Sequence, residues 1–210
     1  MTDVADRQHG HPTPETTTKV ISEDWSRDDL AGRTAAQVEY VRVDLAETTS
    51  TGGLVFDKCV FRDAGFNLSE HTGAAFVNCT FTGCDFFGAK FNDCKFVGSM
   101  FDRCTFDQLT VDGGDWSFVG LPGADLHAAA FEGVRMRETD LTGVNAKGGV
   151  LRKCDLSAAM LNRAQLDRCD LRGSDVSAID PWNVSLRAAV ITWEQAVVLA
   201  AAMGLDVRPD

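Results

Sequence analysis

Seven cysteines are the residues of this sequence whose type and spacing could most readily do chemistry. They are Cys59, Cys79, Cys84, Cys94, Cys104, Cys154 and Cys169, and every interval between them is a multiple of five. A structural zinc site needs four ligands that converge in a tetrahedron, whereas neighbours in a five-residue series would lie on different sides of a coil. We therefore interpret the cysteines as small buried hydrophobic residues, and we predict no metal site.

The four histidines do not complete a catalytic arrangement. His9 and His11 lie in a polar N-terminal segment, His71 occupies a position of the apolar series described below, and His127 is expected outside. No Ser-His-Asp or Cys-His pairing follows from these positions, and no glycine motif that would cradle a phosphate is present. We predict a protein that is not an enzyme and has no cofactor.

A five-residue repeat organises the chain. From Phe56 to Val176 every fifth residue is large and apolar, except His71 and Ala146. The residues two places earlier, from Leu54 to Ser174, are almost all small, and all seven cysteines belong to this second series. Neither a helix of period 3.6 nor a flat strand of period two keeps both series on one side. A chain that turns a corner every five residues does, and glycine recurs at the corners, where it supplies the backbone freedom of a tight turn.

The repeat also predicts the domain boundaries. Residues 1–19 are polar and contain Pro12 and Pro14, so a disordered tail is expected. Residues 20–191 form the array, with a one-residue slip of register near 47–53. Thr192 and Gln195 match a capping box and Gly204 suits a helix end, so residues 192–210 are predicted to form a helix followed by a short strand.

The net charge and the absence of long apolar runs limit the classes of partner that this protein is expected to bind. The net charge is −11, which disfavours direct binding to nucleic acid or an anionic membrane and suits a basic partner surface. No apolar run has the roughly 18 to 20 residues of a membrane-spanning helix, and the N-terminus has no secretory pattern. A cytoplasmic location with reduced thiols is therefore expected.

Units such as CDFFG, ADLHA, TDLTG, CDLSA and CDLRG resemble the pentapeptide-repeat family, A(D/N)LXX. The resemblance covers about 120 residues without a gap and implies an all-β, right-handed quadrilateral β-helix with four pentapeptides per coil. The uninterrupted array and the ending DPWNVSLRAAVITWEQAVVLAAAMGLDV are similar to the fluoroquinolone-resistance group, MfpA and the Qnr proteins. That resemblance implies a homodimer built on the C-terminal helix. It also implies a rod that mimics DNA, binds DNA gyrase, with topoisomerase IV as a second candidate partner, and protects gyrase from quinolones or similar toxins.

Two sets of residues follow as candidate sites. The acidic surface that would contact the partner is predicted to comprise Asp85, Asp102, Asp107, Asp112, Asp115, Asp125, Glu132 and Asp167. If positions 20 apart stack, Asp85, Asp107, Asp125 and Asp167 share one face with Lys147. The dimer interface is predicted to comprise Trp193, Val197, Leu199, Ala200, Met203, Leu205 and Val207.

Two other functional classes stay open. One is a non-catalytic scaffold with another partner, because a fold does not determine a function. The other is an enzyme built on a β-solenoid, but the acyltransferase solenoids have a six-residue period, which the 24 steps of five from Phe56 to Val176 exclude.

Overall fold

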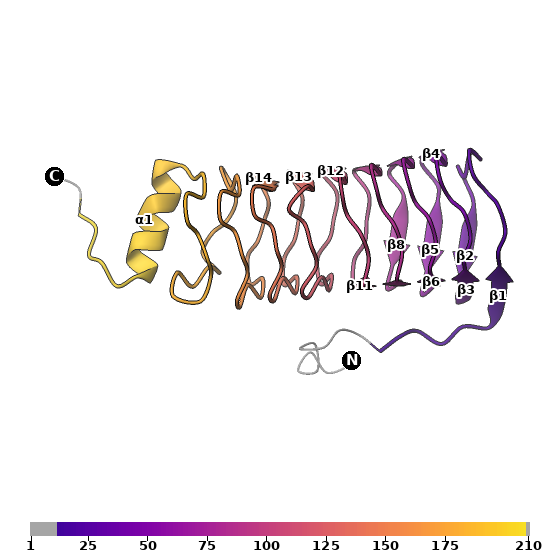
Figure 1. Cartoon of the computed structure of the whole chain (residues 1–210), viewed down its shortest axis with the longest axis horizontal. Coiled ribbons are helices and arrows are strands. Elements are labelled where there is room, and N and C mark those ends of the chain that lie inside the picture. Colours follow the sequence, from indigo (N-terminus) through magenta and orange to yellow (C-terminus); the bar gives the residue numbers. More distant parts are fainter. Residues whose placement is uncertain (1–11, 209–210) are drawn as a thin grey trace.

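A computed structural model describes residues 12–208 as one long solenoid of stacked coils, with a helix at its C-terminal end (Figure 1). Most coils contain 20 residues, since Lys90 pairs with Thr110 and Thr110 with Ala130 in parallel ladders. Twenty residues are four pentapeptides, so each coil has four faces. The expected quadrilateral β-helix is confirmed.

We number the faces 1 to 4 in the order in which the chain visits them. Face 1 carries the sheet of β1 (Thr18–Ile21), β3 (Val38–Val41), β6 (Val60–Arg62), β9 (Thr80–Thr82) and β11 (Met100–Asp102). Face 3 carries β4 (Thr49–Thr51), β7 (Glu70–Thr72), β10 (Lys90–Asn92), β12 (Thr110–Asp112), β13 (Ala130–Glu132) and β14 (Val150–Arg152). Face 4 carries β2 (Thr34–Ala36), β5 (Val55–Asp57) and β8 (Ala75–Val77). Face 2 is joined by isolated parallel bridges from Asp24 to Thr105 and from Asp125 to Ser185.

The slip of register lies at two adjacent glycines. Thr49 pairs with Glu70 and Thr34 with Val55, a separation of 21 residues, whereas Asp29 pairs with Thr49 at 20. Gly52 and Gly53 have φ of 108° and 71°, and a Cβ on Gly53 would lie 3.1 Å from the Gly32 Cα. The extra residue is thus absorbed at a corner where positive φ angles favour glycine and the approach to Gly32 leaves little room for a side chain.

Stacked aromatic rings fill the solenoid. Phe61, Phe81 and Phe101 form one column, with ring centroids 4.9 and 4.7 Å apart and nearly parallel planes. Rings on adjacent faces meet edge to face, as Phe81 and Phe86 do at 5.6 Å. Burial of aromatic surface and these ring geometries stabilise the stack.

The small-residue series has a specific backbone role. Cys79 Sγ donates to the carbonyl oxygens of Phe56 at 3.4 Å and Val77 at 3.5 Å. In the next coil Ser99 Oγ donates to Phe76 O at 2.8 Å and accepts from the Cys79 amide at 2.9 Å. Cysteine and serine therefore have the same role in this position: each is a small side chain that donates a hydrogen bond to a backbone carbonyl of the preceding coil.

Helix α1 (Trp193–Ala202) closes the C-terminal end. Its capping box of Thr192 and Gln195 is present. The Gln195 amide also donates to Leu171 O and Ser174 O, both at 2.7 Å, which fastens the helix to a coil of the solenoid.

The predicted strand after the helix is wrong. Residues 205–208 form no strand in the described part of the chain; the amide of Leu205 bonds back to Ala200 O within the helix end instead. Residues 1–11, which include His9, His11 and most of the predicted tail, lie outside the described residues, and β1 begins at Thr18. Within residues 12–208 no helix has the length and apolar character that crossing a membrane requires.

Candidate protein-binding surface

Burial disfavours the charged form of several thiols and of the core histidine, whereas a hydrogen bond from the Cys79 side chain lowers the pKa of Cys59. Burial raises the pKa of Cys94 and Cys154 to about 11 and that of Cys169 to about 12. His71 is buried, with its Nδ1 2.9 Å from Ser50 Oγ, and burial lowers its pKa to about 4. Over the described residues no three His, Cys, Asp or Glu side chains come together to hold a metal ion. The interior therefore offers packing rather than chemistry.

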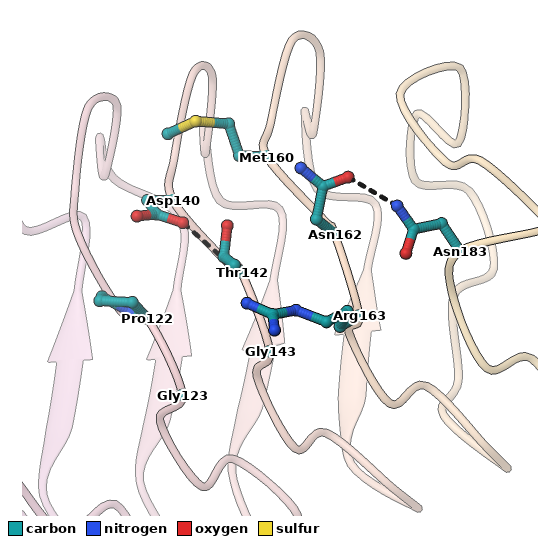
Figure 2. A pocket seen from close by; sticks show the side chains of 9 residues that line it. All are labelled: Pro122, Gly123, Asp140, Thr142, Gly143, Met160, Asn162, Arg163 and Asn183. Carbon is teal, nitrogen blue, oxygen red and sulfur yellow. Dashed lines mark hydrogen bonds between the residues drawn. The ribbon is translucent and has the colours of Figure 1, made fainter. Parts of the chain in front are cut away.

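A groove on face 1 is lined by polar side chains that make hydrogen bonds within the solenoid (Figure 2). The Asp140 carboxylate that faces it accepts the Thr142 amide at 2.9 Å, and the Asn183 amide donates to Asn162 Oδ1 at 2.9 Å. The Arg163 side chain extends toward the backbone at Gly143. The Asp140 carboxylate and the two asparagines are thus engaged with the backbone or with each other.

The outward positions carry the informative charges. In each pentapeptide these are the residue before the central apolar one and the two after it. Over residues 24–133 the outward positions of face 2 hold six carboxylates: Asp24, Asp44, Glu47, Asp85, Asp107 and Asp125. Those of face 3 hold five more: Asp29, Glu70, Asp93, Asp112 and Glu132. The only lysine or arginine at these positions of the two faces are Arg27 and Lys90.

Both of those cations already have partners. Arg27 pairs with Glu47 at 3.2 Å and Lys90 with Glu70 at 2.6 Å. Arg27 lowers the pKa of Glu47 through its hydrogen bond, and Lys153 lowers that of Glu132 in the same way. Faces 2 and 3 are adjacent, so their carboxylates line one edge of the rod. We call the outward positions of faces 2 and 3 over residues 24–133 the acidic edge.

The local fold explains why so many aspartates precede the central residue. Asp44 Oδ1 accepts the Ala46 amide at 2.9 Å, and Asp125 Oδ1 accepts the His127 amide at 3.3 Å. Such a bond to the backbone two residues on is the local turn that aspartate and asparagine favour. Part of the acidity is therefore a consequence of folding, which reasoning from charge alone missed.

The aspartates differ in how many hydrogen bonds their carboxylate oxygens accept within the solenoid. Asp85 accepts from the Phe87 amide at 3.1 Å, from Thr105 Oγ1 and from the Asn67 amide at 2.6 Å, so both of its oxygens are engaged. Asp107 and Asp112 sit after the central residue and have no such turn to make. Among residues 12–208, the one ion-pair partner of the Asp107 carboxylate is His127 Nε2, at 4.0 Å, and Asp112 has none.

The predicted acidic residues do not form one surface. Asp85, Asp107, Asp125 and Asp167 lie on face 2, as the 20-residue stacking predicts, and Asp112 and Glu132 lie on face 3. Asp102 is on face 1 beside Arg103 at 3.0 Å, and Asp115 is on face 4 beside Arg135 at 3.1 Å. The sequence analysis missed six carboxylates of these faces: Asp24, Asp29, Asp44, Glu47, Glu70 and Asp93. Carrying the stacking back through the slip would have found the first four, and applying it to face 3 as well as face 2 would have found Glu70 and Asp93.

The charge of the same two faces reverses toward the C-terminus. Over residues 145–188 their outward positions hold Lys147, Arg152, Lys153, Arg168, Arg172 and Arg187 against Asp167 and Asp170. Asp167 accepts from Ser185 Oγ at 2.5 Å and from the Arg187 amide at 2.8 Å. It therefore lies among cations and outside the acidic edge.

The C-terminal end presents an apolar surface. Trp193, Val197, Met203, Leu205 and Val207 of the predicted interface are exposed, with Trp193 at 75%. Leu199 is half-buried and packs against the core, and Ala200 is also half-buried. Trp182, at 76%, and Val190 are also exposed on the last coils before the helix, and the predicted interface did not include them.

These features define a class of protein: a parallel β-solenoid with an apolar interior, whose candidate binding surfaces are the acidic edge and the exposed apolar residues at the C-terminal end. The family model for pentapeptide repeats matches eight copies, within residues 72–108, 121–157 and 139–177. These segments match the pentapeptide-repeat family, and the described array has the β-helix fold expected of pentapeptide repeats, with a corner at every fifth residue over most of its length.

Comparison with other proteins adds structural likenesses at low identity. No curated protein matches the sequence. The full-length structure of QnrB1, a plasmid-mediated fluoroquinolone resistance protein, is 16% identical with a TM-score of 0.46, covering 91% of this chain and 99% of that one. HetL, a pentapeptide repeat protein involved in heterocyst differentiation regulation in Nostoc sp. strain PCC 7120, is 19% identical with a TM-score of 0.43, covering 88% and 89%.

Proposed function

We propose that this protein binds DNA gyrase as a non-catalytic mimic of duplex DNA. Its acidic edge would occupy a basic surface on which the enzyme holds DNA. The observation that carries the proposal is the acidic edge itself: eleven carboxylates and two cations, both paired, along one edge of a rod. The resemblance of the repeats and of the C-terminal segment to the fluoroquinolone-resistance group supports gyrase as the partner.

The spacing of the charges is compatible with this role. Asp24 and Asp125 are five coil steps apart on face 2, or about 24 Å at roughly 4.8 Å per strand spacing. A duplex of that length carries about 14 phosphate charges at one per 1.7 Å. The edge has a formal net charge of −9, from eleven carboxylates and two cations. It therefore reproduces about two thirds of the charge, on a scaffold whose backbone ladders fix the positions.

We also propose that two copies associate through the exposed apolar surface at the C-terminal end. Isolated apolar residues are ordinary on a protein surface, but a contiguous group marks an interaction site. Trp193, Val197 and Met203 on and beside α1, with Leu205 and Val207 beyond it, are exposed apolar residues within 15 positions of one another, and we infer that they form such a group. In the dimer the acidic edges would lie toward the two outer ends and the cationic segments near the joint.

A supercoiling assay tests the proposed activity. Purified gyrase is titrated with the protein in the presence and absence of a quinolone, and topoisomerase IV is assayed in parallel. We expect inhibition of supercoiling at high protein and fewer quinolone-induced DNA breaks. Neither effect at stoichiometric excess would reject the proposal and leave the scaffold alternative, in which the acidic edge binds another basic protein in the cytoplasm.

A further inference from the structure

An exposed apolar pair interrupts the acidic edge near its middle. Phe87 is 40% exposed on face 2, and Leu68 is 52% exposed at the corner between faces 2 and 3. The Leu68 amide donates to Phe87 O at 2.8 Å. A Cβ on Gly88 would lie 2.7 Å from Leu68 Cδ2, so the leucine side chain rests over the backbone next to Phe87.

Folding does not require either side chain. Leu68 has φ of 58°, a left-handed conformation that glycine adopts without strain and a leucine does not. Gly73, Gly83, Gly88 and Gly98 occupy the equivalent corner of other pentapeptides. At the position of Phe87 the other coils of face 2 have Ser26, Ala46, Asn67, Asp107, His127, Lys147, Asp167 and Arg187. Phe87 is the only aromatic carbocycle in that column, and it is not part of the core.

The pair is held in place from below. The Phe87 amide donates to Asp85 Oδ1, and Asp85 Oδ2 accepts from Asn67, which precedes Leu68. The backbone under both side chains is therefore fixed before any partner arrives. Such preorganisation reduces the entropy lost on binding.

Carboxylates surround the pair. Asp107 follows it in the next coil, since the Gly88 amide bonds to Asp107 O at 2.9 Å. Glu47 precedes it, since the Glu47 amide bonds to Asn67 O at 2.8 Å, and Glu70 lies on face 3 two residues beyond Leu68. A complementary surface must offer an apolar recess with lysine or arginine side chains around it.

We propose that Leu68 and Phe87 form the apolar anchor of the acidic edge, inserting into a hydrophobic recess within the basic surface of a protein partner. The inference rests on the proposed function and deepens it, because DNA has no side chain to place there. The partner would hold this protein by a contact that it does not make with DNA. Apolar anchors surrounded by polar groups commonly dominate protein interfaces, and this one would retain affinity when salt screens the carboxylates.

The test uses the full chain and purified gyrase in an equilibrium binding titration at several salt concentrations. The double variant Leu68→Gly, Phe87→Asn takes residues that the repeat uses at the same positions, so we expect an unchanged or higher thermal midpoint. Its affinity should fall at least about tenfold, and by a similar factor at low and high salt. The control Ile21→Thr removes a side chain equally exposed at 52% on face 1 and should leave affinity unchanged.

The outcomes separate the two proposals. Wild type that binds gyrase while the double variant binds equally well would overturn the apolar anchor and leave the proposed function standing. A loss confined to low salt would also overturn it, because the pair would then act only through neighbouring charges. Wild type that does not bind would reject the proposed function and the anchor together.

Discussion

The rings of Phe81 and Phe101 stack 4.7 Å apart with their planes within 9° of each other. Phe81 stacks equally on Phe61 in the coil before it, at 4.9 Å. Each ring of the column is therefore shared between two neighbours, and the stability of a coil depends on the coils on both sides. This is the nearest-neighbour logic of repeat proteins.

Phe81→Ala should destabilise the protein by about 3–5 kcal/mol, the usual cost of emptying a buried aromatic site. The ring is fully buried and contacts others in three coils. Phe87→Ala is the matched control, since its ring is exposed, and it should change stability by less than about 1 kcal/mol. Urea unfolding followed by circular dichroism measures both. Equal losses would contradict the separation into core and surface phenylalanines.

His71 predicts a specific acid sensitivity. Burial lowers its pKa to about 4 from an ordinary 6.5, so the folded state favours the neutral ring. Between pH 6.5 and about 4 His71 binds a proton in the unfolded chain but stays neutral in the folded chain. The free energy of unfolding therefore decreases as the pH falls through this range. His71→Phe, which restores the residue type of the column, should remove about 2–3 kcal/mol of that loss between pH 7 and 4.5. Identical pH slopes for the two proteins would refute this cause.

The thiols should differ sharply in accessibility. Cys104 is half-buried, and the other six cysteines are buried. Under native conditions we expect an aromatic disulfide reagent to label Cys104 first, and the rest only when the chain unfolds. Cys104→Ser should abolish the early phase. Early labelling of several thiols, or loss of secondary structure on adding a metal chelator, would argue against purely structural cysteines.

Substitution at the helix tests the dimer. Val197→Glu together with Met203→Glu places charges within the proposed apolar interface, where they would be desolvated without partners. Light scattering should show a dimer for the wild type and a monomer for the variant, with similar circular dichroism. Glu138→Gln on face 4, far from the helix in the sequence, is the control and should leave the dimer intact. A monomeric wild type would eliminate this part of the proposal.

Much of the fold could be predicted because the determinants are local and repeated. The five-residue spacing of Phe81, Phe86 and Phe91 indicates a corner in every pentapeptide. The small residues two places before them, such as Cys79 and Ser99, indicate which other side chains point into the coil. The sequence also indicated the slip of register, from the change of phase near residues 47–53. It did not reveal that Gly53 lies close to Gly32 in the preceding coil, because that contact is not local in the sequence. The C-terminal strand was wrong because an extended segment forms a strand only when a partner edge is available.

The surface was less predictable than the core. Four aspartates stack on face 2 as the period requires, but period alone does not tell that Asp85 is occupied by its turn while Asp107 is free of one. The period does place Lys147 beside Asp167, but it does not tell that Asp167 accepts hydrogen bonds from Ser185 Oγ and the Arg187 amide. Those distinctions depend on hydrogen bonds between coils, which sequence spacing does not encode.

The most direct test of the central claim is competition with DNA. Gyrase is bound to a fluorescent duplex, and the protein is titrated in while anisotropy is recorded. The account predicts displacement of the duplex by the wild type. Asp107→Asn with Asp112→Asn and Asp125→Asn removes three charges but keeps the amide acceptor at Asp125, and it should compete at least about tenfold more weakly at low salt, with a smaller salt dependence. Gyrase that keeps its duplex in stoichiometric excess of the wild type would contradict the claim that the acidic edge occupies the DNA-binding surface.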